Sequence, residues 1–420
     1  MTNRSNLLSV TEAQLAILAN IRRLEPESVD LLDSLTRVLA EDVVSDVDLP
    51  PFDNSSMDGY AVRAEDVHGA SPDQPAQLPV VGDIPAGQPT QVILPPGAAT
   101  RIMTGAVMPA GADTVVPVED TDDGGRGASP VPGSVMIRRS LDRGAFVRYA
   151  GDDVKRGERV LTAGAVVRPA EVALLAAVGH RRVRVYRRPR VALLATGDEL
   201  VPPDQVPGPG QIRNVNEHAT AALVVQYGGI PISLGIARDR LDAVSEKLEQ
   251  AIGQGVDLIV ASAGVSVGAY DLVKDAVTAH GSIDLWRVRM RPGKPLAFGQ
   301  YRGVPFFGLP GNPVSALLTF EQFVRPVLRV MAGYAHWRRP TIEVILRESI
   351  DSDGRETYAR AWVERDGNRW TARLSGGQGS NMLSSLVRAN ALVIVPDGVK
   401  HLAAGDPAQA QLLSEPEDSR

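Results

Sequence analysis

The chain has 420 residues with a net charge of −6 at neutral pH, and 44% of its residues are hydrophobic. This length predicts about two to four domains, and the acidic balance argues against nucleic-acid binding, which needs a basic surface. Cysteine is absent, which excludes disulfides, thiolate nucleophiles and cysteine zinc sites, while the lack of a long apolar run or a signal-peptide pattern predicts a cytoplasmic protein without membrane contact.

The first 187 residues divide into helical and β-rich stretches. Thr11 and Gln14 form a capping-box pattern that opens the predicted helix TEAQLAILANIRRL, and residues 29–42, VDLLDSLTRVLAED, predict a second helix. Residues 49–146 contain short β-rich runs broken by proline and glycine, which predict a compact β domain. Residues 147–187 combine a helical run with an alternating strand, and we expect them to pack with the N-terminal helices.

The second half predicts an α/β domain followed by a β domain. Strand-like runs such as RVALLATG and VDLIVASAG alternate with amphipathic helices between residues 188 and 332, as in a parallel, doubly wound sheet. Beyond residue 333 mainly strands are expected, with Asp366-Gly367 as a hairpin signal. The expected fold class is therefore multidomain α/β, with a mixed N-terminal domain (1–48 and 147–187), a β-rich inserted domain (49–146), a central doubly wound α/β domain (188–332) and a small β-barrel-like domain (333–420).

One stretch, LPPFDNSSMDGYAV at residues 49–62, has two interpretations. Its prolines, serines and asparagine are typical of a solvated linker, which composition alone favours. The alternative is a shaped loop in which Asp58-Gly59 forms a turn that presents a carboxylate.

Polar residues follow five of the predicted strands in the central domain. Because ligands of open α/β sheets bind beyond the carboxyl ends of the strands, these residues are candidates for one site. Each of them alone is more often a helix cap or a surface charge, so only their common location indicates a site. They are Asp198 and Glu199, Arg238 and Asp239, Ser266 and Asp271, Arg291 and Lys294, and Asn312 and Ser315.

The chemistry of these residues indicates a metal-assisted site for an anionic, phosphorylated ligand. Glu199, Asp239 and Asp271 are hard oxygen ligands that suit Mg²⁺. Arg291 and Lys294 suit an anion, as does Arg287 nearby, although an alternating arginine strand also fits a solvated face.

The sequence GLPGNPVSALLTF adds a second type of anion contact. Asn312 is a candidate helix cap, Pro313 fits the first turn, and the free N–H groups of such a turn bind phosphate or another oxyanion. The plain alternative is an ordinary helix start, which we consider the more frequent meaning of Gly-Asn-Pro.

A competing hypothesis is a serine hydrolase. Residues 264–268, GVSVG, match the nucleophile elbow, with Ser266 as nucleophile and His336 or His401 as base. No oxyanion motif precedes Ser266, and a hydrolase would leave the charged strand ends unexplained. Walker A and dinucleotide fingerprints are absent from the sequence.

The ordered set PPFDNSSMDGYAV, RIMTGAVMP, GADTVVPVED, TGDEL, GVSVGAYD, RPGKP and GLPGNPVSALLTF resembles the molybdopterin molybdenumtransferases, whose animal relatives form the C-terminal part of gephyrin. The resemblance covers nearly the whole chain. It implies an elongated homodimer whose central domain is similar to molybdopterin adenylyltransferase. It also implies hydrolysis of adenylylated molybdopterin with a divalent cation, taken here as Mg²⁺, in the presence of molybdate, to give AMP and molybdenum cofactor.

The resemblance also assigns roles to individual residues. Asp58 and Thr104 are implied to face the central domain of the other subunit, and Glu199, Asp239 and Asp271 to handle metal and ligand. The residues implied to bind substrate are Arg148, Asp153, Ser266, Arg287, Arg291, Lys294, Pro310, Asn312, Pro313, Ser315, Arg360 and Ser380. Many relatives carry lysine at the positions of Arg287 and Arg291, and a planar guanidinium is not equivalent to a point charge.

The implied partners are a second copy of the chain, molybdopterin adenylyltransferase and acceptor molybdoenzymes, and the sequence leaves open which partner delivers the substrate. An alternative within the family is a non-catalytic scaffold of the gephyrin type. The chain has no extended linker for partner binding, so we favour the enzyme.

Overall fold

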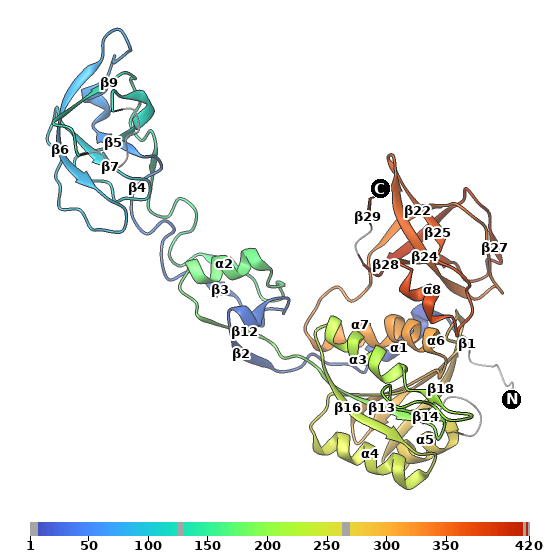
Figure 1. Ribbon diagram of the computed structural model, residues 1–420. Helices are drawn as coiled ribbons and strands as arrows, with labels where there is room; N and C mark the ends of the chain where they lie inside the picture. Colours follow the sequence, from blue (N-terminus) through green and yellow to red (C-terminus); the bar gives the residue numbers. More distant parts are fainter. Residues whose placement is uncertain (1–6, 124–129, 263–268, 415–416, 419–420) are drawn as a thin grey trace. The chain divides into compact units, whose positions relative to one another are not determined.

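The computed structural model describes residues 7–123, 130–262, 269–414 and 417–418. The chain forms two compact units (Figure 1). The first unit comprises Met1–Ser28, Thr36–Ala40 and Arg184–Arg420, and the second comprises Val29–Leu35 and Glu41–Val183.

The first unit is built on a mixed sheet with the strand order β1-β18-β20-β21-β17-β13-β16. Strands β16, β13, β17 and β21 run parallel, whereas β20 runs antiparallel to both β21 and β18. The strand bounds are Leu7–Leu8 (β1), Arg190–Thr196 (β13), Ile230–Ala237 (β16), Leu258–Ser262 (β17), Gly281–Val288 (β18), Pro295–Tyr301 (β20) and Val304–Leu309 (β21).

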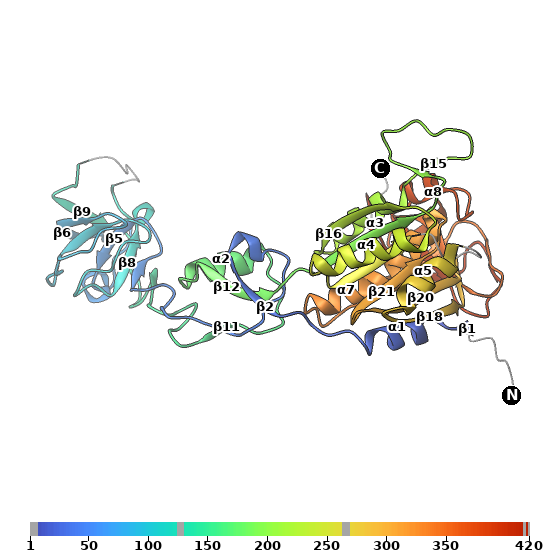
Figure 2. The same ribbon diagram turned by 90° about the horizontal axis from the view of Figure 1, so that it is seen from below.

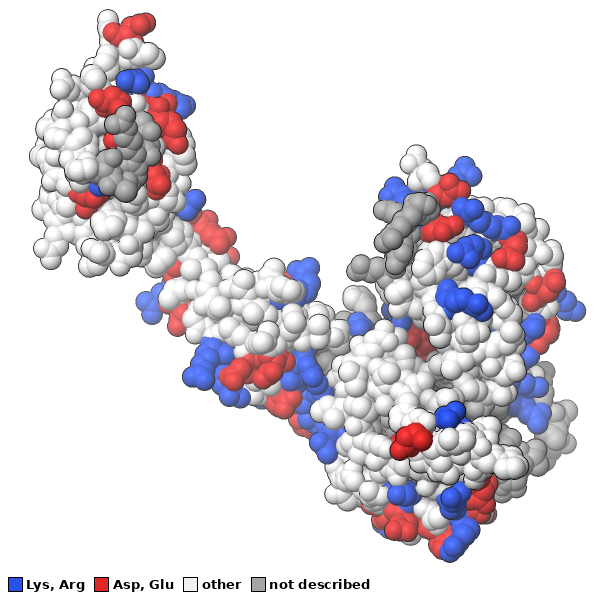
Figure 3. Space-filling model, viewed as in Figure 1, with Lys and Arg blue, Asp and Glu red and all other residues white. Residues whose placement is uncertain are grey.

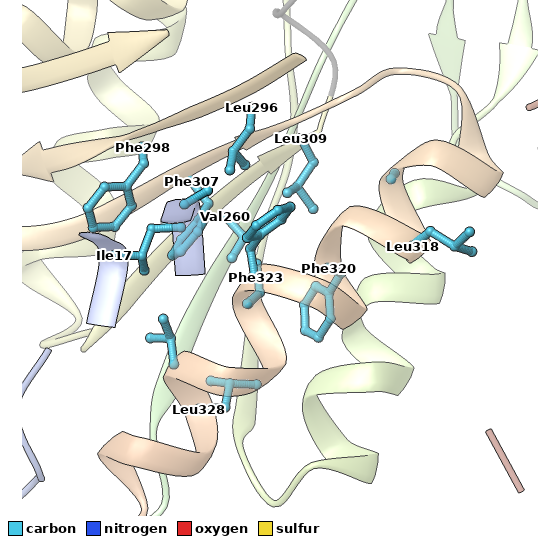
Figure 4. Packing of buried hydrophobic residues seen from close by; sticks show 14 of the residues in the cluster. Ile17, Val260, Leu296, Phe298, Phe307, Leu309, Leu318, Phe320, Phe323 and Leu328 are labelled. Atoms are coloured by element: carbon cyan, nitrogen blue, oxygen red, sulfur yellow. The ribbon is translucent and has the colours of Figure 1, made fainter. Parts of the chain in front are cut away.

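Helices cover both faces of this sheet, as the doubly wound fold class requires (Figures 1 and 2). In strand β13, Val191 and Leu193 point to the core shared with α1, α3 and α6, and Ala192 and Leu194 point to the core shared with α4 and α5. Figure 4 shows the first core, in which Phe307 of β21 lies among residues of the sheet and of the covering helices. The helix bounds are Val10–Leu18 (α1), Asn216–Gln226 (α3), Leu241–Gly253 (α4), Ala269–Thr278 (α5), Pro313–Thr319 (α6) and Arg325–Met331 (α7).

A π-helical segment, Phe320–Val324, joins α6 to α7. The carboxylate of Glu321, which is 6% exposed, accepts hydrogen bonds from Nε of Arg325 at 2.8 Å and from Nε of Arg339 at 2.6 Å. Arg339 also donates to the carbonyl oxygen of Leu412. These contacts connect the helical run formed by α6, the π-helical segment and α7 to the C-terminal part of the unit.

The C-terminal part of the first unit is a closed barrel, as expected. Strand β22 pairs with β25 and β28, β24 pairs with β25 and β26, and β26 pairs with β28, so the ring closes on itself. The strand bounds are Thr341–Leu346 (β22), Glu356–Asp366 (β24), Arg369–Leu374 (β25), Ala391–Val395 (β26) and Pro407–Leu412 (β28). The hairpin predicted at Asp366-Gly367 is confirmed, because Asp366 pairs with Arg369 and Gly367 has a φ of 58°.

Short elements complete the first unit. Their bounds are Leu200–Val201 (β14), Ile212–Arg213 (β15), Met290–Arg291 (β19), Ile350–Asp351 (β23), Leu383–Val387 (α8), His401–Leu402 (β27) and Glu417–Asp418 (β29). Strands β2 (Pro26–Asp30) and β12 (Arg182–Tyr186) each include residues of both units, because the chain passes from one unit to the other within them.

The second unit contains a β sheet in the order β8-β5-β7-β6-β9, whose core includes Tyr60, Val62 and Val116. The strands are Gly59–Val62 (β5), Ala76–Ile84 (β6), Ala99–Ile102 (β7), Thr114–Pro117 (β8) and Ser134–Ile137 (β9). The remaining elements are Leu32–Ser34 (η1), Val43–Val44 (β3), Asn54–Ser55 (β4), Ala64–Val67 (η2), Val118–Asp120 (η3), Val147–Arg148 (β10), Arg159–Leu161 (β11) and Pro169–Ala177 (α2).

Two local predictions near the N-terminus were wrong. Helix α1 is capped by Ser9, which exchanges hydrogen bonds with Glu12, not by Thr11. Residues 29–42 form no long helix but a short 3-10 turn, and Ala40 N–H bonds to the carbonyl of Arg184 at 2.9 Å. Pairing with a distant segment overrides the local helical propensity there. The predicted domain boundaries stay a prediction.

On the face drawn in Figure 3, positive and negative side chains are interspersed, without one extended basic surface. This distribution fits the acidic net charge.

Candidate active site

The strand topology brings several predicted site residues to one edge of the central sheet. Glu199 follows β13 and Asp239 follows β16, and both strands end at the same edge because they are parallel. Asn312 follows β21, which ends there too. Strand β20 is antiparallel to its neighbours, so the turn with Arg291 and Lys294 that leads from β18 to β20 also lies at this edge.

The acidic residues of this edge are exposed. Asp198, which precedes Glu199, contacts the turn after β16, since its Oδ1 accepts the N–H of Asp239 at 3.3 Å and forms an ion pair with Arg238 at 3.9 Å. Glu199 and Asp239 are both exposed. Within the described part of the chain, no group of three or more acidic or histidine side chains is close enough to hold a metal ion. Ser266 and the side chain of Asp271 lie outside the described residues, so the full predicted set is not tested.

The basic turn is attached to the barrel. Strand β19, Met290–Arg291, pairs in parallel with β24 at Glu356 and Thr357, and Arg355 donates to the carbonyl of Met290 at 2.9 Å. Arg287 and Lys294 are exposed. The pairing brings Arg291 toward the barrel residues that follow in β24.

Arg360 of β24 is the most buried charged residue near this edge, with 1% exposure. Its guanidinium donates to Ser385 Oγ at 3.1 Å and to the carbonyls of Gly377 and Gly379 at 3.0 and 3.1 Å. Burial, and secondly the charge of Arg291, lowers the pKa of Arg360 to about 10. Among the described residues no carboxylate pairs with Arg360. A buried cation beside a second cation creates a positive field that favours an anion.

The loop whose Gly377 and Gly379 carbonyls bind Arg360 also contacts the start of α6. Asn312 occupies the N-cap position, but its side chain makes no capping hydrogen bond. Pro313 lies in the first turn, as predicted, and Val314 donates its N–H to the carbonyl of Ser380 at 3.2 Å. Ser380 therefore uses one of the N–H groups that we expected to be free for an anion. Pro310 and Ser315 are buried beside this turn.

The remaining predicted residues lie in the second unit. Oδ1 of Asp58 accepts the N–H of Thr104 at 2.6 Å and its hydroxyl at 2.7 Å. These bonds, first the backbone N–H and then the hydroxyl, lower the pKa of Asp58. Arg148 pairs with Asn54 between β10 and β4, and Asp153 donates its N–H to the carbonyl of Leu49 at 2.9 Å.

The stretch from residue 49 to 62 is a shaped loop rather than a linker. The hydroxyl of Ser55 bonds to the carbonyl of Met57 at 2.5 Å, and Asp53 accepts the N–H of Ala150 at 2.9 Å. Gly59 lies in β5 so close to β8 that an added Cβ would stand 2.0 Å from the carbonyl oxygen of Val116. Only glycine fits there, and the hydrogen bonds from Thr104 hold the preceding residue, Asp58, in place.

Sequence reasoning missed Asn216, the first residue of α3. It is 8% exposed, and its Nδ2 donates to the carbonyl of Gly311 at 2.8 Å. The available signal was an asparagine at a predicted helix start, which indicates a cap and not a contact with a loop distant in sequence.

No helix in the described parts of the chain is long and apolar enough to cross a membrane.

Comparisons with known proteins agree with this architecture. Three family models match the chain: the MoeA N-terminal region (domain I and II) at residues 8–179, a probable molybdopterin binding domain at residues 192–330, and the MoeA C-terminal region (domain IV) at residues 343–413.

Similar proteins span nearly the whole chain. The chain is 42% identical to the molybdopterin molybdenumtransferase of a Nostoc species, over 91% of this chain and 87% of that protein. It is 40% identical to molybdopterin molybdenumtransferase 2 of Mycobacterium tuberculosis, over 96% and 98%. The structure matches the crystal structure of a molybdopterin biosynthesis protein, moeA, from Pyrococcus horikoshii with a TM-score of 0.79 and 31% identity, over 97% of this chain and 100% of that one. The chain therefore belongs to the molybdopterin molybdenumtransferases, a family of enzymes of molybdenum cofactor biosynthesis.

Proposed function

We propose that this enzyme inserts molybdenum from molybdate into molybdopterin, and that it does so with hydrolysis of adenylylated molybdopterin, releasing AMP and molybdenum cofactor. The single observation that carries the mechanism is Arg360, a buried guanidinium next to Arg291 with no carboxylate partner among the described residues. A buried guanidinium that lacks a carboxylate partner in the described part of the chain, with a second cation beside it, suits a tetrahedral oxyanion such as molybdate or a phosphate group.

The two basic residues have different tasks in this proposal. Arg291, partly exposed at the sheet edge, contacts the oxyanion, while Arg360 behind it adds a fixed positive charge. Because Arg360 is fixed by three hydrogen bonds, its charge needs no rearrangement when the oxyanion arrives.

A divalent cation fits the acidic side of the same edge. Mg²⁺ takes one or two carboxylates and completes its shell with water and phosphate oxygens, and Glu199 and Asp239 supply two exposed carboxylates there. We propose that these residues, with Asp271, hold Mg²⁺. Bound there, the ion would neutralise charge on the phosphoanhydride that is cleaved.

We further propose that the enzyme acts as a homodimer in which Asp58 of one copy serves the sheet edge of the other. Asp58 is ionised at neutral pH, because its pKa lies below the usual value, and its position is fixed by Thr104. Mixing Asp58→Ala chains with Asp271→Ala chains tests this arrangement. Recovered activity in the mixture supports a shared site, and activity no higher than that of either variant alone contradicts it.

The assay for the main proposal supplies adenylylated molybdopterin, molybdate and Mg²⁺. It measures AMP release and the reconstitution of a molybdenum-free apo-molybdoenzyme. We expect both to depend on molybdate and on the cation. AMP release no greater than in an enzyme-free blank would refute the proposal.

A further inference from the structure

The peptide between Gly311 and Asn312 is fixed by a residue from another part of the chain. Helix α3 packs beside α6 (Figure 1), and Nδ2 of Asn216 donates to the Gly311 carbonyl at 2.8 Å. Since a carbonyl oxygen only accepts, the amide nitrogen of Asn216 must face it, and the orientation of the side chain follows from chemistry.

Fixing the carbonyl also fixes the neighbouring N–H group. The Gly311-Asn312 bond is not among the cis peptide bonds, and in a trans peptide the C=O and N–H groups point in opposite directions. The N–H of Asn312 therefore points away from Asn216. It has no hydrogen-bond partner among the described residues, and Asn312 is exposed.

Without this bond the peptide would have a second orientation available. Rotation of the peptide plane changes ψ of Gly311 and φ of Asn312 together, and glycine permits such a change at low cost. A rotated peptide would direct a carbonyl oxygen, which repels anions, to the place where the N–H group now points.

The position of Asn216 is itself well defined. The preceding segment is anchored because Ile212 N–H bonds to the carbonyl of Glu199 at 2.8 Å. The next residue, Glu217, accepts from Asn214 Nδ2 at 2.6 Å and from the hydroxyl of Ser233. The start of α3 thus connects the strand end at Glu199 with the turn at Gly311.

The burial of Asn216 is costly for stability alone. Its Oδ1 is buried without a hydrogen-bond partner among the described residues, and a buried unpaired acceptor is unfavourable. Within the described parts of the chain, this side chain makes one hydrogen bond, to the turn at Gly311, so its role lies in that turn.

We propose that Asn216 is a positioning residue that turns the Asn312 N–H group toward a tetrahedral oxyanion at the sheet edge. The inference rests on the proposed function, since it assumes an oxyanion there. The oxyanion is either molybdate or a phosphate group of the substrate, which share this geometry and chemistry.

The test measures oxyanion binding directly. The full chain, without added metal, is titrated by calorimetry with sodium molybdate and separately with inorganic phosphate. The variants are Asn216→Ala, which removes the donor, and Asn216→Asp, which places an oxygen against the Gly311 carbonyl. Asn20→Asp is the matched control, because Nδ2 of Asn20 also donates to a backbone carbonyl, that of Ala16 at 3.0 Å.

We expect Asn216→Ala to weaken binding of one oxyanion about tenfold, the effect of one hydrogen bond, and the affected oxyanion identifies the ligand. Asn216→Asp adds a distinctive signature. A protonated Asp donates O–H to the carbonyl again, so its affinity relative to Asn216→Ala should rise as the pH falls from about 8 to about 5.5, where a buried carboxyl becomes protonated. Glu217 is the neighbouring carboxyl, and its charge raises the pKa of an Asp at position 216 further.

Unchanged binding of both oxyanions in Asn216→Ala overturns the inference, as does a wild-type chain that binds neither. A ratio of Asn216→Asp to Asn216→Ala that does not change with pH also counts against it, and this ratio separates positioning from general destabilisation. The titrations use no adenylylated substrate, so a failed AMP-release assay would refute the proposed function without deciding this inference.

Discussion

Replacing Arg360 with methionine tests the charge that carries the proposed mechanism. Methionine keeps the length of the apolar stem, so the main change is loss of the guanidinium. Two unit charges about 8 Å apart interact by about 2 kcal/mol at an effective dielectric constant of about 20. A loss of about 2 kcal/mol corresponds to roughly thirtyfold weaker binding of a molybdate ion.

The same substitution should change stability less than it changes binding. Three hydrogen bonds disappear, to Ser385, Gly377 and Gly379, at about 1 kcal/mol each. Burial of an unfavourable charge disappears as well, because the pKa of Arg360 is lowered to about 10 in the folded protein. The two effects offset each other, so the midpoint of thermal unfolding should fall by only a few degrees.

Calorimetric titration with molybdate and thermal unfolding together provide the assay for Arg360→Met. Arg373→Met is the matched control, since Arg373 lies on β25 of the same barrel and is exposed. A variant that binds molybdate as tightly as the control would refute the reasoning.

Three further substitutions probe other parts of the chain. Asp58→Ala should lower AMP release and cost about 1–2 kcal/mol of stability at pH 7, because the two hydrogen bonds from Thr104 disappear. Since the folded pKa of Asp58 is lowered, the same stabilisation should be lost in the wild type as the pH falls below about 4; a much larger loss of stability at neutral pH would indicate a structural role. Gly59→Ala should destabilise the second unit by about 3 kcal/mol, since its Cβ would meet the Val116 carbonyl at 2.0 Å, and unchanged protection from proteolysis would contradict this. Glu321→Gln leaves Arg325 buried without its charge partner, so urea unfolding should show a loss of about 3–5 kcal/mol, and a neutral result would mean that water reaches the site.

The sheet edge was predictable because its signal is local. An apolar strand followed by a glycine-rich turn, as before Glu199 and Asn312, can be recognised from a short stretch of sequence. Because parallel strands end at the same edge of the sheet, the polar residues that follow them are expected to lie together. Strand β20 was not predicted, because it begins at Pro295, directly after the turn at residues 291–294. A proline in a run of residues argues against a central strand. Its place in the sheet depends on antiparallel pairing with two neighbours.

The contacts that complete the candidate site could not be derived from local pattern. Val314 meets Ser380, and Asn216 meets Gly311, through segments far apart in the chain. Only packing of the barrel and of α3 against the start of α6 creates them. The failed helix at residues 29–42 has the same cause, since Ala40 bonds to Arg184 instead of to a neighbouring turn.

The closed barrel also determines when this enzyme becomes competent during synthesis. Its first strand, β22, pairs with its last, β28, which ends at Leu412. The ring that positions Arg360 therefore cannot close until residue 412 has emerged from the ribosome, whereas the sheet that bears Glu199 and Asn312 is already complete by residue 309. A nascent chain would accordingly gain its acidic sheet edge early in translation and its buried guanidinium late, so that oxyanion capture becomes one of the last properties to appear.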